Sequence, residues 1–150
     1  MMNQNDLLEL MNESEAVYLA TVEDSIPRIR ALVNLRRSDL YPGPSRFCRA
    51  QGFTVYLSTS AATNKVGEVQ TRPLASVYYC IPREFHGITL TGPVEILTDP
   101  NLRKTLWDEA WRFYFPMGDS DPNYVLLRIK PTEAEGWWGR EKFRLTLEDL

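Results

Sequence analysis

Residues 53–73 read FTVYLSTSAATNKVGEVQTRP, and no other segment says as much about the architecture of this chain. An apolar, aromatic strand ends abruptly in hydroxyl and small residues, and a lysine then opens a short predicted helix that Pro73 closes. Hydroxyl groups, the unpaired N–H groups of a first helical turn and an ammonium group all favour a bound phosphate. The residues predicted to supply these groups are Ser58, Thr59, Ser60, Thr63, Asn64 as the helix cap, and Lys65.

Composition limits the function classes that remain. The 150 residues include 43% hydrophobic and 25% charged residues, which is typical of one globular domain spanning 1–150. The net charge of −3 argues against a nucleic-acid partner, and the apolar runs are too short to cross a bilayer. Because the first residues are acidic where a signal peptide needs a basic segment, we expect a cytoplasmic protein.

Metal and disulfide chemistry have little support in the sequence. Cys48 and Cys80 have no CxxC spacing, so free thiols are expected rather than a bridge or a metal pair. His86 is the single histidine, which excludes sites built from several imidazoles. We therefore predict no metal site.

The N-terminal part predicts a short helix followed by a hairpin. Leucines at 7, 8 and 10 give residues 5–15 the spacing of an amphipathic helix. The β-rich runs 16–22 and 26–35 flank a tight turn at 23–25, which is typical of a hairpin.

Alternation along the second hairpin strand separates two faces. Arg28 and Arg30 share one face with Leu32 and Asn34, while the other face is expected in the core and holds Ile29, Ala31, Val33 and Leu35. Arginines on a strand face are usually solvated, so taken alone this pair indicates a surface. A hydroxyl cluster taken alone is likewise more often a plain helix cap than a phosphate site.

The remaining segments favour a mainly β fold. Residues 36–52 contain two prolines and two glycines and are read as the longest loop. Further strands are predicted at 74–82, 88–97 and 124–131, with one helix over 99–114 that has a cap and a proline at its start. Five or six short strands broken by one good helix point to an antiparallel barrel with helical decoration. In that helix Trp107 and Trp111 lie four residues apart, which is the usual spacing of a packing stripe.

Taken in order, these pieces resemble the pyridoxamine 5'-phosphate oxidase-like FMN-binding split barrels, particularly their general-stress-protein branch. The resemblance covers almost the whole chain and rests on AVYLATV, a turn and P-x-x-R at Pro27 and Arg30. It continues with YLSTSAATNK, a proline eight residues beyond Lys65, LTGPVEILTD, a tryptophan-bearing helix and DPNYVLLRIKPTEAEGWW.

The resemblance implies a split antiparallel β-barrel and a homodimer that holds two FMN molecules at its interface. By position, Arg30 would face the phosphate and ribityl side, and Thr63 and Lys65 would hold the phosphate. Leu57, Ser58 and Thr59 would lie beside the isoalloxazine edge. Trp138 would approach the ring from the partner chain, although Trp137 remains the alternative because adjacent strand residues point to opposite sides.

Two departures from the oxidase pattern stand out. Asn64 precedes Lys65 where the oxidase has an arginine, so one phosphate cation is missing unless Arg28 replaces it. The C-terminal Arg-x-His clamp of the oxidase has no counterpart in GWWGREKFRLTLEDL, which disfavours vitamin B6 oxidation.

The sequence and the resemblance together favour an FMN-dependent oxidoreductase with a small-molecule electron donor such as NAD(P)H and an unidentified acceptor. No side chain stands out as a catalytic acid or base, as expected where the cofactor carries the redox chemistry. The alternatives are a non-enzymatic flavin-binding or stress-related protein, and a split barrel that binds a deazaflavin or haem instead.

Overall fold

The computed structural model describes residues 2–61 and 73–147. Within these residues the strands are β1 Ala16–Glu23, β2 Ile26–Val33, β3 Val55–Ser60, β4 Leu74–Ile81, β5 His86–Leu97, β6 Tyr124–Ile129, β7 Glu133–Trp138 and β8 Glu141–Thr146. The helices are α1 Gln4–Glu13, α2 Pro42–Arg49 and α4 Pro100–Thr105, with short 3-10 helices η1 Pro82–Glu84, η2 Glu109–Phe113 and η3 Gly118–Ser120. No helix in the described part of the chain is long and apolar enough to cross a membrane.

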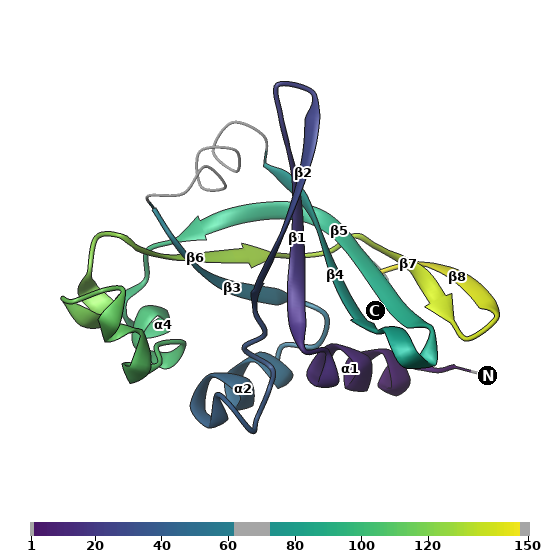
Figure 1. Ribbon diagram of the computed structural model, residues 1–150, viewed down its shortest axis with the longest axis horizontal. Coiled ribbons are helices and arrows are strands. Elements are labelled where there is room, and N and C mark those ends of the chain that lie inside the picture. The colour runs from purple at the N-terminus through teal and green to yellow at the C-terminus, as the bar shows by residue number, and fades with distance from the viewer. Residues whose placement is uncertain (1, 62–72, 148–150) are drawn as a thin grey trace.

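The eight strands form one antiparallel sheet that curls into a half-barrel (Figure 1). Its strand order is β2-β1-β4-β5-β6-β3, and β7 and β8 continue from β5. The twelve-residue β5 pairs with β7 along its first half and with β6 along its last four residues. Strands β2 and β3 therefore lie at the two ends of the order, one on each side of the split. The prediction of a mainly β, antiparallel barrel is confirmed.

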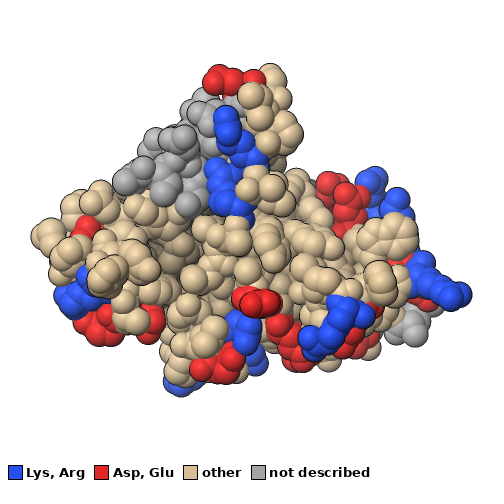
Figure 2. All heavy atoms as spheres, in the orientation of Figure 1, with Lys and Arg blue, Asp and Glu red and all other residues tan. Residues whose placement is uncertain are grey.

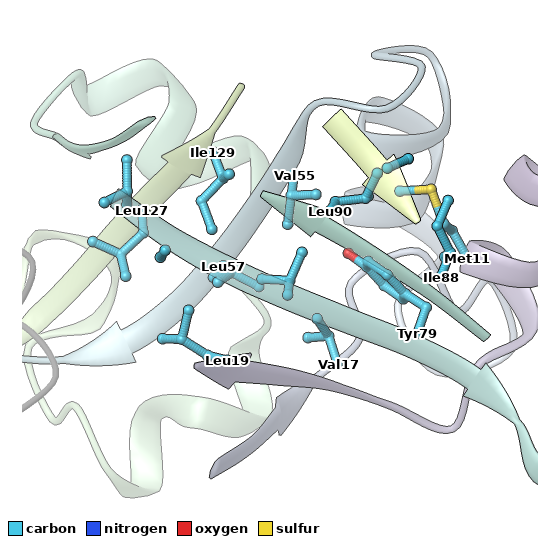
Figure 3. Packing of buried hydrophobic residues seen from close by; sticks show 14 of the residues in the cluster. Met11, Val17, Leu19, Val55, Leu57, Tyr79, Ile88, Leu90, Leu127 and Ile129 are labelled. Carbon is cyan, nitrogen blue, oxygen red and sulfur yellow. The ribbon is translucent and has the colours of Figure 1, made fainter. Parts of the chain in front are cut away.

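The concave face of the sheet holds the main hydrophobic core. Figure 3 shows Val17 and Leu19 of β1 meeting Leu57 of β3 and Leu127 of β6, and α1 adds Met11. These five side chains are at most 1% exposed. The core thus ties β1 to β3 and β6 across the barrel, although β1 shares no hydrogen-bonded pairing with either strand in the described residues.

The helix α2 corrects the expectation of a long loop over residues 36–52. Its two prolines, Pro42 and Pro44, fall in the first turn, where a helix does not need their N–H groups. The same prolines were interpreted as loop formers, because composition does not say where in a helix a proline will fall. The helix packs Cys48 into a second cluster, and burial raises the pKa of the Cys48 thiol to about 12.

A buried arginine joins α1, α2 and the end of β2. Arg36 is 3% exposed, and its guanidinium donates to the side-chain oxygen of Asn12 at 2.8 Å. It also donates to the carbonyl oxygens of Cys48 and Gly52, both at 3.0 Å. Burial lowers the pKa of Arg36, and these neutral oxygens replace the water that the cation loses.

The prediction of one long helix over 99–114 is wrong. Helix α4 ends at Thr105, Asp108 is extended with φ −119° and ψ 128°, and a separate 3-10 helix follows. The reason is packing: Trp107, Trp111 and Phe115 all turn onto the ring of Tyr124, at centroid distances of 5.1, 6.1 and 5.4 Å. In one straight helix Trp107 and Phe115 would share a face but lie about 12 Å apart along the axis, which is too far for both to pack on a single ring.

The expectation that Ile29, Ala31, Val33 and Leu35 lie in the core is wrong for the first three, which are exposed. Ile29 is 70% exposed and Val33 39% exposed, while Arg30 and Leu32 on the other face are half-buried. The concave side of the curled sheet is the buried one, and in β2 that side carries the arginines. The apolar side lies on the outer surface of the sheet.

Candidate functional site

A cavity of about 610 Å³ lies at the split of the half-barrel, between β2 and β3. Its volume is within the range of roughly 300–1,000 Å³ typical of small-molecule sites. Two strand segments and one aromatic segment line it: Ala31, Leu32 and Val33 of β2, Ser58, Thr59 and Ser60 of β3, and Trp111, Tyr114 and Phe115 of η2 and the residues after it. The topology thus brings together segments that lie far apart in the chain.

Strand β3 presents an edge to this cavity. Among the described strands it pairs only with β6. The N–H of Ala61 donates to the carbonyl of Asn123, just before β6, at 2.8 Å. Because the backbone N–H and C=O groups of successive strand residues point to alternate sides, those of Ser58 and Ser60 point away from β6. Hydroxyl groups and backbone amide groups of one strand therefore gather at the cavity wall.

Thr59 carries an unsatisfied hydroxyl at this wall. The residue is 6% exposed, and its Oγ1 has no hydrogen-bond partner in the described part of the chain. A buried hydroxyl without a partner costs about 1–3 kcal/mol, so such groups are rare unless something completes them. The position of Thr59 in a cavity lining makes a ligand polar atom the natural partner.

The neighbouring Ser58 and Leu57 differ in what they can offer. Ser58 lines the cavity, and its hydroxyl lies 3.3 Å from the hydroxyl of Tyr124. Burial raises the pKa of Tyr124 to about 12, so its hydroxyl stays protonated. Leu57 is 1% exposed in the main core, so only its backbone is placed to reach a ligand.

The two arginines of β2 lie beside the cavity on the concave face. Figure 2 shows basic side chains on the β1–β2 hairpin, whose basic residues are Arg28 and Arg30. Arg30 is half-buried and donates to the hydroxyl of Thr21 at 2.6 Å, while Arg28 is exposed. Leu32, on the same face as Arg30, lines the cavity. Arg30 therefore lies two residues from a lining residue on the same face, but neither Arg28 nor Arg30 is among the described residues of the lining.

Thr63, Asn64 and Lys65 lie outside the described residues. Their predicted contacts with a phosphate remain predictions. The described ends nearest to them are Ala61, directly after β3, and Pro73, directly before β4.

The two C-terminal tryptophans lie away from this cavity. Trp138 is half-buried and stacks on His86, with ring centroids 3.6 Å apart and planes 7° apart. Trp137 is 50% exposed and lines a second cavity of about 520 Å³ near the β4–β5 turn. Within one chain neither residue reaches the β2–β3 cavity, so any approach to a ligand there requires a second subunit, as the resemblance implies.

The aromatic wall of the cavity was missed by sequence reasoning. The spacing of Trp107 and Trp111 was attributed to packing, which is right for Trp107, but Trp111 also lines the cavity. The sequence did contain a signal for an extended aromatic surface, because Phe115 follows Trp111 at the same four-residue interval that separates Trp107 from Trp111. No group of three or more His, Cys, Asp or Glu side chains in residues 2–61 and 73–147 could hold a metal ion.

Known proteins match the chain along nearly its full length. The family model described as pyridoxamine 5'-phosphate oxidase matches residues 4–138. General stress protein 26 of Bacillus subtilis (strain 168) is 25% identical over 154 residues, which covers 98% of this chain and 99% of that protein.

Solved structures share the fold. A Clostridium acetobutylicum protein related to general stress protein 26 superposes with a TM-score of 0.77 at 23% identity, over 99% of both chains. A Nostoc punctiforme protein described as pyridoxamine 5'-phosphate oxidase-related and FMN-binding gives a TM-score of 0.53 at 16% identity, over 94% of this chain and 82% of that one. These likenesses identify the half-barrel as a split barrel of this structural group.

Proposed function

The chain belongs to the pyridoxamine 5'-phosphate oxidase family, and from that premise we propose that it binds FMN in the β2–β3 cavity and acts as an FMN-dependent oxidoreductase. The observation that carries the proposal is the buried, unpartnered hydroxyl of Thr59 in the lining of this cavity. One relative by fold is described as FMN-binding, which agrees with the choice of cofactor.

The residues present suit a flavin at both of its ends. The isoalloxazine ring has flat apolar faces and a polar edge, and the cavity offers Leu32 and Val33 beside the hydroxyls of Ser58 and Thr59. The phosphate needs cations and hydroxyl donors. We assign Arg30 to that end, together with Thr63, Asn64 and Lys65, and with Arg28 as the replacement for the missing family arginine.

The protein groups hold and orient the cofactor rather than transfer protons themselves. When bound, FMN supplies the hydride and electron transfer. The β3 hydroxyls and backbone amides would fix the polar edge of the ring, and the apolar walls would keep water from its faces. The electron donor is assigned to the NAD(P)H class.

We assign the second subunit of a homodimer to the outer face of the sheet. Pairing of Ala20 with both Ile29 and Ser76 puts alternate residues of β1, β2 and β4 on this face. The face is apolar and uncovered: Val22 is 40%, Ile29 70% and Leu74 63% exposed. Contiguous exposed apolar side chains of this kind mark association surfaces. Sedimentation of the purified protein should give about twice the 17.3 kDa chain mass, and a single-chain mass would contradict the dimer.

Reduction by a nicotinamide separates an enzyme from a flavin carrier. Under anaerobic conditions, NADH or NADPH should bleach the flavin absorbance of the FMN-loaded protein, and added oxidant should restore it. Full retention of the oxidised spectrum with both nucleotides would contradict an NAD(P)H-dependent oxidoreductase and favour a carrier.

Replacement of Thr59 by valine tests the site with two opposite effects. The FMN-free protein should become more stable by about 1 kcal/mol, because a buried hydroxyl without a partner is replaced by a methyl group of similar size. FMN affinity should fall by roughly fivefold, because a hydrogen bond of about 1 kcal/mol to the ligand is lost. Urea unfolding and fluorescence titration with FMN measure the two quantities.

Thr89→Val is the matched control for this experiment. Thr89 is a half-buried threonine of β5 that pairs with Tyr78 and does not line the β2–β3 cavity. It should leave FMN affinity unchanged. Equal FMN affinity in wild type and Thr59→Val would show that the Thr59 hydroxyl does not bind FMN.

A further inference from the structure

The β2–β3 cavity has a second wall that the cofactor assignment does not use. Trp111, Tyr114 and Phe115 line it together with the residues of β2 and β3. They come from one short segment, so the aromatic groups form a continuous side of the cavity. The strand side supplies hydroxyl and amide groups, whereas this side supplies mainly aromatic surface.

This aromatic wall is held in place by a buried tyrosine. Trp111 and Phe115 contact the ring of Tyr124 at centroid distances of 6.1 and 5.4 Å, and Tyr41 contacts Trp111 at 5.8 Å. The hydroxyl of Tyr124 lies 3.3 Å from Ser58 Oγ and donates to the carbonyl of Leu106 at 3.3 Å. Aromatic packing on one anchored ring fixes the wall before any ligand arrives, and such preorganisation lowers the cost of binding.

The exposed ring of Tyr114 gives the wall a free binding surface. Tyr114 lines the cavity and is 72% exposed, in contrast to Tyr124, which is 0% exposed. The three side chains of the wall carry no charge. An anion or cation placed against this wall would lose water without gaining an ion partner there, which is costly. A flat uncharged ring would instead gain offset or edge contacts.

We propose that the aromatic wall of Trp111, Tyr114 and Phe115 is the subsite for a second substrate, and that this substrate is a planar, uncharged aromatic molecule. The proposal rests on the proposed function, because it takes the strand side of the cavity as the place of FMN. It deepens that function by naming the chemical class of the molecule that would lie next to the flavin ring.

Binding of a redox-inert ligand pair tests this subsite without measuring turnover. Naphthamide and naphthoate have nearly the same shape, and only the second carries a charge. Calorimetric titration of the FMN-loaded protein should show naphthamide binding at least roughly tenfold more tightly than naphthoate. Naphthamide should bind without releasing FMN, because the two ligands are assigned to different walls of the cavity.

Two variants and a control locate the bound ring. Tyr114→Ala and Trp111→Ala should each weaken naphthamide binding by roughly fivefold or more, because each removes an aromatic contact. Phe85→Ala is the control: Phe85 is 74% exposed and lines the second cavity rather than this one. It should leave binding unchanged. Because Trp111 also packs against Tyr124, the exposed Tyr114 is the decisive variant if Trp111→Ala fails to fold.

Each outcome separates this inference from the FMN assignment. Tight FMN binding with no binding of naphthamide, or with equal loss in Tyr114→Ala and Phe85→Ala, would overturn the subsite and leave the FMN assignment intact. Release of FMN by naphthamide would overturn it too, because the wall would then be the position of the flavin. Failure to bind FMN would overturn the proposed function, and tighter binding of naphthoate than of naphthamide to the FMN-loaded protein would overturn the uncharged class.

Discussion

Arg36→Ala should lower the free energy of unfolding by about 3–5 kcal/mol, because it removes three hydrogen bonds of a charged group at about 1.5–3 kcal/mol each, offset in part by the loss of a costly buried cation. The guanidinium donates to the side chain of Asn12 and to the carbonyls of Cys48 and Gly52. Its removal takes the guanidinium donor from the buried Asn12 oxygen and from both carbonyls, and it opens a hole between α1 and α2. Urea unfolding followed by circular dichroism measures the loss.

The adjacent residue is a matched control for this prediction. Arg37 forms an ion pair with Asp39 at 2.7 Å, and the Asp39 side chain is 60% exposed. An exposed pair of this kind contributes about 0–1 kcal/mol, so Arg37→Ala should change stability little. Similar losses in the two variants would show that Arg36 does not hold the three segments together.

Arg30→Ala should weaken FMN binding by roughly tenfold to a hundredfold, because a charge-assisted phosphate contact contributes about 1.5–3 kcal/mol. Arg30 is held beside the cavity by its hydrogen bond to Thr21, which reduces the entropy lost when it meets the ligand. Arg28 is exposed, so Arg28→Ala should have a smaller effect. The dissociation constant from flavin fluorescence titration measures both.

The same titration extends to the residue predicted from sequence alone. Lys65→Ala should also weaken FMN binding by roughly tenfold to a hundredfold if its ammonium contacts the phosphate. Arg83→Ala serves as the control, because Arg83 is an exposed cation of η1, next to the second cavity. If Arg30→Ala and Lys65→Ala both bind FMN as tightly as Arg83→Ala does, the phosphate does not lie between β2 and the segment after β3.

Strands were well predicted from sequence where alternation and β-branched residues coincide. The runs around β1, β4 and β6 lie within one or two residues of their predicted bounds. The hairpin of β1 and β2 is present as expected, with Asp24 and Ser25 at positive φ in its turn. These elements are determined by neighbours in the sequence, so local pattern was sufficient.

Features set by distant packing were not predicted. The break after Thr105 depends on Tyr124, which follows nineteen positions later in the sequence. The exposure of Ile29 depends on which way the whole sheet curls. The aromatic wall combines both effects, because Tyr114 reaches the cavity only when α4 has ended and the barrel has curled. The predicted residues Ser58 and Thr59 line the same cavity as Leu32, and Arg30 lies two residues from Leu32 on the same strand face, because β2 and β3 end the strand order on either side of the split.

The visible absorbance spectrum of the purified protein, with identification of the released chromophore, tests the central claim most directly. A cavity built from the β2 and β3 edges, with the unpartnered Thr59 hydroxyl in its lining, predicts a yellow protein with a flavin spectrum. Denaturation should release FMN, at about one molecule per chain after saturation. A colourless protein that cannot be loaded with FMN, or a spectrum of haem or a deazaflavin, would contradict the account.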